Sequence, residues 1–580
     1  MLIENDADVN AHGGHYGNAL QAASAKGHLE IVQMLIQKGA DINAQGGLYG
    51  NALQAASERG HLEIARLLIQ KGADINAQGG EYNNALYAAS AEGHLEIAEM
   101  LIQKGADINA QGGQYGNALQ AALAKGHLEI AQMLIENDAD VNAHGGHYGN
   151  ALQAASAKGH LEIVQMLIQK GADINAQGGL YGNALQVASE RGHLEIARLL
   201  IQNGADINAQ GGEYNNALYA ASAEGHLEIA EMLIQNGADI NAQGGLYGNA
   251  LQAASERGHL EIARLLIQKG AHINAQGGLY GNTLQAASFQ GHPEIAETLV
   301  ENSADINAQG GPYGNALQAA SAGGNLEIAE MLIQKGADIN AQGGPYGNAL
   351  QAALAEGNLE IAEMLIQKGA DVNAQGGLFG NALQAALAKG HLEIVQMLIK
   401  KGADINAQGG PYGNALQAAS AGGYLEIARL LIQNGADINA QGGQYGNALQ
   451  AASFQGHLEI AETLIQKGAD INAQGGKYGN TLQAASAEGY LEIARLLIQN
   501  GADINAQGGQ YGNALQAASF QGHLEIAETL IQKGADINAQ GGKYGNTLQA
   551  ASAGGYLEIA EMLIQNGADI NAQGGQYEGR

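Results

Sequence analysis

The chain has 580 residues, of which 46% are hydrophobic, and it contains no cysteine. These values argue against a disordered chain and exclude both a disulfide framework and a thiolate metal site. Its 26 basic and 57 acidic residues give a net charge of −31, which argues against nucleic-acid binding because a phosphate backbone requires a basic footprint.

The sequence also shows no sign of membrane insertion or export. No apolar run reaches the roughly 20 residues of a membrane span, and no signal peptide begins at Met1. We therefore expect a cytoplasmic protein, with the nucleus as the alternative location. The acidic surface either favours a partner with a basic or neutral surface or serves only to keep a long chain in solution.

One segment of 33 residues repeats along the chain without insertion or deletion. The stretch Gly39–Ser57 reads GADINAQGGLYGNALQAAS, and its first glycine recurs at every period up to Gly567, with Asp6, Asp138 and Ser303 in the exceptional slots. A fixed period of this length is the signature of units that stack on their neighbours. The period therefore predicts a repeat architecture instead of several globular domains.

The repeats predict one continuous array over residues 1–580, with partial units at 1–17 and 567–580. Met1 falls in the middle of a helical segment, and Arg580 follows directly after a loop tip. Stacked repeats normally end in units with a polar outer face, and neither end has one. We expect either a piece of a larger protein or uncapped ends through which the chain associates with itself.

Each full unit reads as two short helices and a loop. In the second unit, Asn51 caps a helix over 52–59 that stops at Gly60, and a second helix over 61–71 stops at Gly72. An extended stretch over 73–82 then leads into a Gly-Gly turn. The same order recurs down the chain, so we expect an all-α solenoid of about 17 stacked helix-turn-helix units with projecting hairpin loops.

The residues of the second helix indicate which side faces the interior. Ile64, Ala65, Leu68 and Ile69 fall on one helical face. A single unit has too few such side chains to offset the entropy of ordering its backbone, which is about 1–2 kcal/mol per residue. Stacking buries the remaining faces, so the units are expected to be stable only together.

This pattern resembles the ankyrin repeat. The carrying residues are the G-H-L-E-I-A run of the second helix, the G-A-D hinge and the N-A that follows it. The family's usual T-P-L-H start of the first helix is replaced by Asn51-Ala52-Leu53-Gln54 and its copies, in which Asn can cap and Gln can donate a hydrogen bond. The N-A-L-Q-A-A variant is similar to arrays behind the NACHT-type NTPase module of fungal immune-like receptors.

The repeats differ most at one loop position, which we call the tip. Its residues are His15, Leu48, Glu81, Gln114, His147, Leu180, Glu213, Leu246, Leu279, Pro312, Pro345, Leu378, Pro411, Gln444, Lys477, Gln510, Lys543 and Gln576. In ankyrin proteins the loops and the inner helices form the concave binding face, so the resemblance implies that these side chains contact a partner. The alternative is unconstrained variation of exposed turns.

Aromatic residues form three further sets of candidate positions. The residue after each tip is Tyr, with Phe379 once, and we expect these rings to pack on one another with their hydroxyls in water. Tyr87 and Tyr219 replace the usual Gln of the first helix and are candidate partner anchors. Near the ends of first helices we expect exposed apolar side chains at Phe289, Phe454 and Phe520.

No constellation of catalytic or ligand-binding residues emerges. His12 with His15, and His144 with His147, lack a third metal ligand, and the histidines that begin the second helices are replaced by Asn or Tyr in five repeats. We interpret those histidines as hydrogen-bonding groups at the helix start. The sequence thus predicts no enzyme activity, no metal and no cofactor.

Two segments of the chain are near-exact copies of other segments. Residues 1–113 match 133–245 except at Ala55/Val187, Lys71/Asn203 and Lys104/Asn236. Residues 435–500 match 501–566 with three changes. Copying of whole blocks is compatible with a recognition surface that diversifies.

Our leading hypothesis is a protein–protein interaction scaffold that binds partners through its loop tips and inner helices. One alternative is the sensor segment of a larger NACHT-type receptor whose NTPase and effector domains lie outside this chain. The other is a mechanical spacer.

Overall fold

The computed structural model describes residues 8–572. The chain divides into two compact units, Met1–Leu279 (unit 1) and Tyr280–Arg580 (unit 2). The partial units expected at 1–17 and 567–580, and the tip Gln576, fall wholly or partly outside the described residues. One continuous array over the whole chain stays a prediction. The described residues hold 34 helices, in agreement with the expected helix-turn-helix repeats.

Unit 1 contains helices α1 to α16 and the short strand β1. Their bounds are α1 Ala19–Lys26, α2 Leu29–Gln37, α3 Ala52–Glu58, α4 Leu62–Gln70, α5 Ala85–Glu92, α6 Leu95–Gln103, α7 Ala118–Lys125, α8 Leu128–Glu136, α9 Ala151–Lys158, α10 Leu161–Gln169, α11 Ala184–Glu190, α12 Leu194–Gln202, α13 Ala217–Glu224, α14 Leu227–Gln235, α15 Ala250–Arg257, α16 Leu260–Gln268 and β1 Gln276–Gly277.

Unit 2 contains strand β2 and helices α17 to α34. Their bounds are β2 Gly281–Asn282, α17 Thr283–Gln290, α18 Pro293–Glu301, α19 Ala316–Gly323, α20 Leu326–Gln334, α21 Ala349–Glu356, α22 Leu359–Gln367, α23 Ala382–Leu387, α24 Leu392–Lys400, α25 Ala415–Gly422, α26 Leu425–Gln433, α27 Ala448–Gln455, α28 Leu458–Gln466, α29 Thr481–Glu488, α30 Leu491–Gln499, α31 Ala514–Gln521, α32 Leu524–Gln532, α33 Thr547–Gly554 and α34 Leu557–Gln565.

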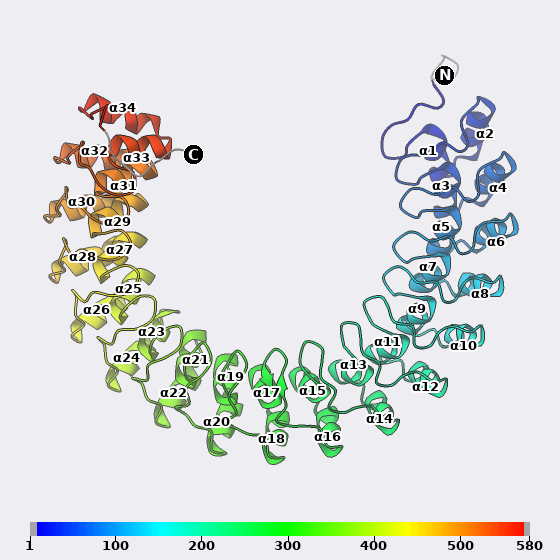
Figure 1. Cartoon of the computed structure of the whole chain (residues 1–580), viewed down its shortest axis with the longest axis horizontal. Coiled ribbons are helices and arrows are strands. Elements are labelled where there is room, and N and C mark those ends of the chain that lie inside the picture. Colours follow the sequence, from blue (N-terminus) through cyan, green and yellow to red (C-terminus); the bar gives the residue numbers. More distant parts are fainter. Residues whose placement is uncertain (1–7, 573–580) are drawn as a thin grey trace. The chain divides into compact units, whose positions relative to one another are not determined.

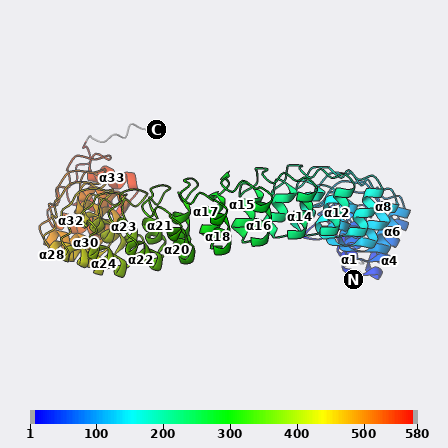
Figure 2. The same cartoon turned by 90° about the horizontal axis from the view of Figure 1, so that it is seen from below.

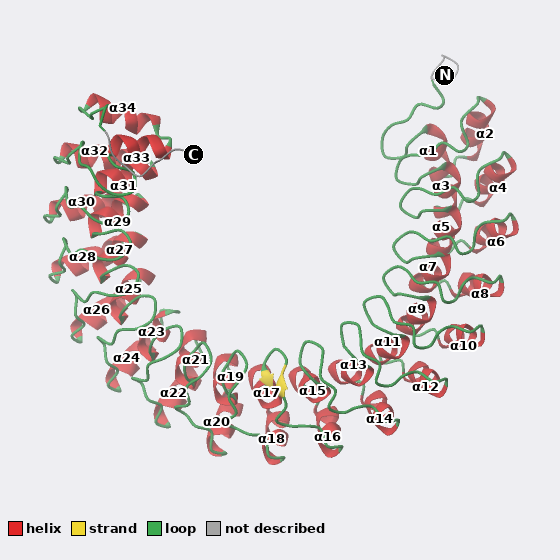
Figure 3. Cartoon of the chain, in the orientation of Figure 1, coloured by secondary structure: helices red, strands yellow, loops and turns green. Residues whose placement is uncertain are grey.

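Within each unit the helices form two rows. The odd-numbered helices pack on the next odd-numbered helix and form the inner row, and each also contacts the even-numbered helix that follows it, which belongs to the outer row (Figures 1 and 2). The loops project beyond the inner row (Figure 3). The tips therefore lie on the side of each unit that the inner-row helices occupy.

Each inner-row helix begins at a capped asparagine, as predicted. The Asn51 Oδ1 accepts a hydrogen bond from the Gln54 backbone N at 2.8 Å, and most repeats complete a capping box in which the Gln side chain accepts from the Asn backbone N. Most of these helices end at a glycine with positive φ, such as Gly27 at 78°. Side chains larger than hydrogen are strained there, which explains the recurrent glycine.

The interior of each repeat is built from alanine and branched aliphatic side chains. Leu53 and Ala56 of α3 are at most 1% exposed, and Ile64, Ala65 and Leu68 of α4 are at most 2% exposed. These are the core positions that the helical periodicity predicts, except that Ile69 is only half-buried. The small alanines allow neighbouring inner-row helices to approach closely.

In most repeats a buried glutamine connects the repeat to the next. In unit 2, the Gln318 Nε2 lies 3.3, 3.2 and 2.7 Å from the carbonyl oxygens of Ala341, Gly343 and Gly347, which form the next hairpin. Its Oε1 accepts from the Asn315 backbone N at 2.7 Å. The prediction that this Gln donates a side-chain hydrogen bond is confirmed, and its acceptors lie in the following repeat.

Two further rows of hydrogen bonds also cross between repeats. The Asn43 Oδ1 accepts from the Asp74 backbone N at 2.7 Å, and the same pair of positions is bonded in most described repeats. The His94 Nε2 lies 2.8 Å from the Glu58 carbonyl oxygen of the preceding repeat. The interpretation of this histidine as a hydrogen-bonding group at the helix start is confirmed, and its acceptor lies in the previous inner-row helix.

We predict that Gln318→Ala destabilises the two repeats that it joins by about 2–4 kcal/mol, because buried carbonyl groups lose their donor. Hydrogen exchange should show reduced protection of the amides in 315–350, with distant repeats unchanged. Gln334→Ala, which removes an exposed glutamine from the outer-row helix α20, is the matched control. Equal protection in Gln318→Ala and wild type would contradict the assigned role.

Candidate functional site

The tip side chains face solvent in both units. Each described tip is exposed except Gln510, which is half-buried. The apolar tips are prominent: Leu246 is 61% exposed and Leu378 is 64% exposed. Exposed leucines on a supported loop offer contact area to a partner, whereas their contribution to the fold is small.

The backbone holds the tips in a row. The Leu48 N donates to the His15 carbonyl oxygen at 3.0 Å, and the Glu81 N donates to the Leu48 carbonyl oxygen at 3.0 Å. In unit 2 the Lys543 N donates to the Gln510 carbonyl oxygen at 3.0 Å in the same way. Where this bond is formed, neighbouring tips are fixed relative to one another; the tips Pro312, Pro345 and Pro411 have no N–H to donate and cannot form it.

The tyrosines beside the tips form the row of packed rings that the sequence predicts. Tyr16 and Tyr49 stack with centroids 5.8 Å apart, and Tyr313 and Tyr346 stack at 6.4 Å. In several repeats the hydroxyl bonds to the residue that ends or directly follows the inner-row helix, ten positions later, for example to Arg59 from Tyr49 at 2.9 Å. The expectation that the hydroxyls lie free in water is wrong for those repeats.

Three phenylalanines reinforce this row in unit 2. Phe289 lies 4.3 Å from the Tyr313 ring centroid, Phe454 lies 4.7 Å from Tyr478, and Phe520 lies 4.1 Å from Tyr544. All three side chains are half-buried. The prediction of exposed apolar side chains is therefore corrected: each ring packs between successive tyrosines.

Tyr87 and Tyr219 occupy the interior instead of the surface. Both side chains are 2% exposed. The Tyr87 hydroxyl accepts from the Tyr115 backbone N at 2.9 Å, and the Tyr219 hydroxyl accepts from Tyr247 in the same way at 2.8 Å. They take over the connection to the next hairpin that Gln makes elsewhere. Our interpretation of Tyr87 and Tyr219 as partner anchors requires exposed side chains, whereas both are buried. They are therefore not part of the candidate surface.

A second substitution accompanies each of these tyrosines. Four residues before Tyr87, the usual glycine is Asn83, which has a φ of 69° and donates from Nδ2 to the Gln111 carbonyl oxygen at 2.7 Å. In the common repeat, a Cβ on Gly50 would meet the Gln54 Oε1. Asn therefore fits only where the Gln is absent, which explains why the two changes occur together.

Acidic side chains cluster at two places in unit 1, at the C-terminal ends of the inner-row helices α3 and α5 and at those of α11 and α13. Burial raises the pKa of Glu58 to about 7; the guanidinium of Arg59, 3.3 Å away, lowers it, and Glu92 and Glu81 raise it further. Burial likewise raises the pKa of Glu190 to about 6. Tyr82 donates to the Glu92 Oε1 at 2.8 Å. In the first cluster, the three carboxyl groups of Glu58, Glu81 and Glu92 thus face a single guanidinium, that of Arg59.

The described residues show no assembly typical of metal or membrane binding. Nowhere in 8–572 do three His, Cys, Asp or Glu side chains gather as metal ligands would, and none of the helices there has the length and apolarity to cross a bilayer. The rings of His15 and His147 lie edge-on to Tyr16 and Tyr148, 5.7 and 5.6 Å away. These contacts make them part of the tip surface.

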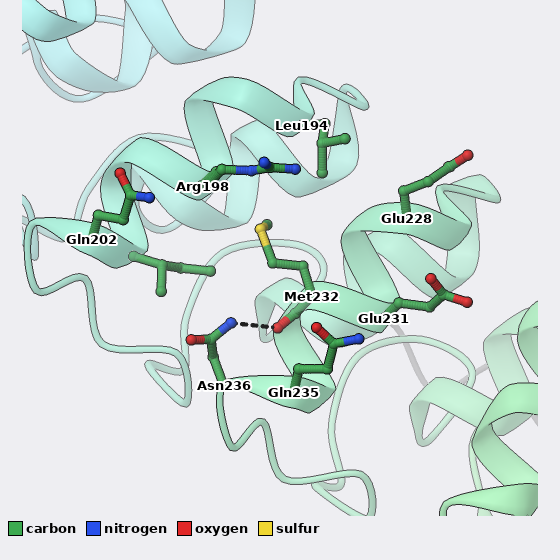
Figure 4. A pocket seen from close by; sticks show the side chains of 9 residues that line it. Leu194, Arg198, Gln202, Glu228, Glu231, Met232, Gln235 and Asn236 are labelled. Carbon is green, nitrogen blue, oxygen red and sulfur yellow. Dashed lines mark hydrogen bonds between the residues drawn. The ribbon is translucent and has the colours of Figure 1, made fainter.

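Two equivalent grooves lie on the outer row of unit 1. One of about 470 Å³ lies between α12 and α14 and is lined by Leu194, Arg198, Ile201, Gln202, Glu228, Glu231, Met232, Gln235 and Asn236 (Figure 4). Its counterpart of about 440 Å³ lies between α4 and α6. The Asn236 Nδ2 donates to the Met232 carbonyl oxygen at 2.7 Å within the wall. None of the predicted site residues lines either groove.

The comparison with protein families agrees with this architecture. A family model described as ankyrin repeats (3 copies) matches residues 19–112, 111–178, 179–244, 243–310, 284–376, 317–409, 376–442, 416–508 and 481–574. The chain belongs to the ankyrin-repeat family. Among curated proteins none matches it. Ankyrin repeats are generally protein–protein interaction modules, and proteins built from them are typically non-enzymatic scaffolds.

We predict that the Asn83–Tyr87 pair of this ankyrin chain is energetically coupled. Tyr87→Gln alone should destabilise its repeat, because the Gln Oε1 would occupy the space of the Asn83 Cβ. The double variant Asn83→Gly with Tyr87→Gln restores the common pair and should recover about 1–3 kcal/mol. A double-mutant cycle by hydrogen exchange measures this coupling, and additive effects would contradict it.

The raised pKa of Glu58 predicts a pH-dependent stability. The ordinary pKa of this carboxyl is 4.5, and in the fold it is about 7. Between these two pH values the folded chain binds more protons at Glu58 than the unfolded chain does, so lowering the pH from 8 to 5 stabilises the fold. Glu58→Gln should stabilise the repeat by about 1–3 kcal/mol at pH 8 and by little at pH 5.

Local hydrogen exchange at the two pH values tests this prediction. Glu63→Gln, which removes an exposed carboxyl from the first turn of α4, is the control and should have a smaller effect. A Glu58→Gln effect that is the same at both pH values would show that the buried charge is not its cause.

Proposed function

We propose that this chain binds partner proteins through its tip surface, which consists of the tips and the exposed end residues of the inner-row helices. The observation that carries the proposal is the contrast between a fixed support and variable side chains. The hydrogen bonds between neighbouring tips and the stacked tyrosines recur along both units, while the tips change between acid, base, amide, imidazole, proline and leucine. Rigid scaffolds that present variable loops are typical of recognition surfaces.

The electrostatics favour partners with basic or neutral surfaces. The net charge of −31 attracts basic segments over several ångströms and raises their association rate at low ionic strength. Self-association, the receptor-sensor hypothesis and the spacer hypothesis stay predictions. Nothing in the described residues favours them over partner binding through the tips.

The test is affinity capture with the whole chain as bait, comparing wild type with the double tip variant Glu81→Leu/Glu213→Leu. We expect partners bound by wild type to be lost or weakened at least tenfold in the tip variant, because both acidic tips are removed. The matched control, Glu99→Leu/Glu231→Leu, makes the same change in charge and size on exposed outer-row positions. Equal capture by wild type and the tip variant would overturn the proposal.

A further inference from the structure

The block copy in unit 1 preserves one surface in full. Residues 1–113 and 133–245 differ at three positions. Ala55 and Val187 are both 0% exposed, and the other two pairs end outer-row helices: Lys71 or Asn203, and Lys104 or Asn236. None of the three is a tip, a ring of the tyrosine row or an end residue of an inner-row helix. The tip surface is therefore chemically identical in the two blocks.

The two blocks also agree in geometry. We define surface A as Leu48, Glu58, Arg59, Glu81 and Glu92, and surface B as the corresponding residues Leu180, Glu190, Arg191, Glu213 and Glu224. The Arg–Glu ion pairs measure 3.3 Å in A and 3.2 Å in B. The Tyr–Glu hydrogen bonds measure 2.8 and 2.9 Å. In both, the Glu tip donates its backbone N to the preceding Leu tip at 3.0 Å. Surface B therefore repeats surface A in shape.

Each surface combines an apolar contact with unbalanced negative charge. Leu48 is 38% exposed and Leu180 is 48% exposed. Surface A places Glu58, Glu81 and Glu92 around one guanidinium, so its net charge is negative whether or not Glu58 carries a proton. That guanidinium is already bonded to Glu58 and the Tyr49 hydroxyl. A partner with one basic and one apolar side chain would therefore complement both features.

A third place in the chain has only part of this combination and can be compared with surfaces A and B. The pair Glu256–Arg257 repeats the arrangement of Glu58–Arg59, with an ion pair of 3.2 Å. The tip that follows it is Leu279 instead of a glutamate, and that leucine is 49% exposed. This third place therefore has an exposed leucine but no acidic tip. The acidic tip therefore distinguishes surfaces A and B from the other repeats of unit 1.

We infer that unit 1 binds the same kind of protein segment twice, once at surface A and once at surface B, and that this segment carries an Arg or Lys beside an apolar side chain. The inference rests on the proposed function and adds the chemistry of the partner and its stoichiometry. The two surfaces are four repeats apart, about 40 Å at roughly 10 Å per stacked helix pair. A partner that carries the segment twice would gain affinity from simultaneous binding.

The experiment uses the full chain and a fluorescein-labelled library of nonapeptides in which an Arg-Leu pair stands in a Gly/Ser background with varied neighbours. The tightest peptide is titrated calorimetrically. We expect two peptides per chain with equal affinity. Glu81→Gln should remove one site and leave the dissociation constant of the other within about twofold, Glu213→Gln should do the same, and the double variant should lose both.

Matched controls come from the chain itself. Lys71→Asn reproduces a difference that already exists between the blocks, and it should leave both sites intact. A tandem peptide with a flexible linker that spans about 40 Å should bind wild type at least tenfold more tightly than the single peptide. Glu81→Gln should abolish that gain.

The outcomes separate the inference from the proposed function. Binding of one peptide per chain, no binding at millimolar peptide, or equal binding of a peptide with Glu in place of Arg would overturn the inference. If such a Glu peptide binds and the tip variants weaken it, the proposed function stands and only the partner chemistry is wrong. If the Arg-Leu peptide binds and only Glu99→Leu or Glu231→Leu weakens it, both are wrong.

Discussion

In most repeats the architecture depends on one buried side-chain amide. The Gln of the inner-row helix caps its own helix through Oε1 and bonds through Nε2 to carbonyl groups 23, 25 and 29 residues later. Those carbonyls are buried or half-buried, so water cannot replace the donor without cost. An inserted or deleted residue between the Gln and the next hairpin would displace all three acceptors together. The constant 33-residue period keeps this contact intact wherever the Gln is present.

A scaffold fixed in this way restricts where the sequence can vary. The tip side chain contributes little to the hydrogen bonds between repeats, and the end residue of the inner-row helix needs only to suit a tyrosine hydroxyl. A tyrosine hydroxyl can both donate and accept a hydrogen bond. The Tyr49 hydroxyl accepts from Arg59, and the Tyr82 hydroxyl donates to Glu92. Charge can thus change sign at this position without loss of the ring packing. The two variable positions lie side by side, and together they form the tip surface.

The sequence predicts what depends on local pattern and misses what depends on side-chain direction. The repeat length, the Asn caps, the two helices and core positions such as Leu68 follow from spacing and are confirmed. The burial of Tyr87, the position of Phe289 between tyrosines and the backward contact of His94 join residues in different repeats. A periodic sequence offers each side chain an equivalent neighbour on both sides, so the pattern alone does not decide which one it contacts.

The same contacts are retained where the chain copies blocks of several repeats. Tyr87 requires Asn83 in its own repeat and contacts the Tyr115 backbone in the next, while Asn83 bonds to Gln111. Asn83 and Tyr87 lie in one repeat, and their partners in the next repeat are backbone groups that every repeat supplies, so a copied block carries the pair intact and forms the same contacts at its edges. The copy 133–245 retains this pair as Asn215 and Tyr219, and the sequence diverges directly after it, where Gln114 corresponds to Leu246. Block copying therefore multiplies a tip surface while it preserves the contacts that support it.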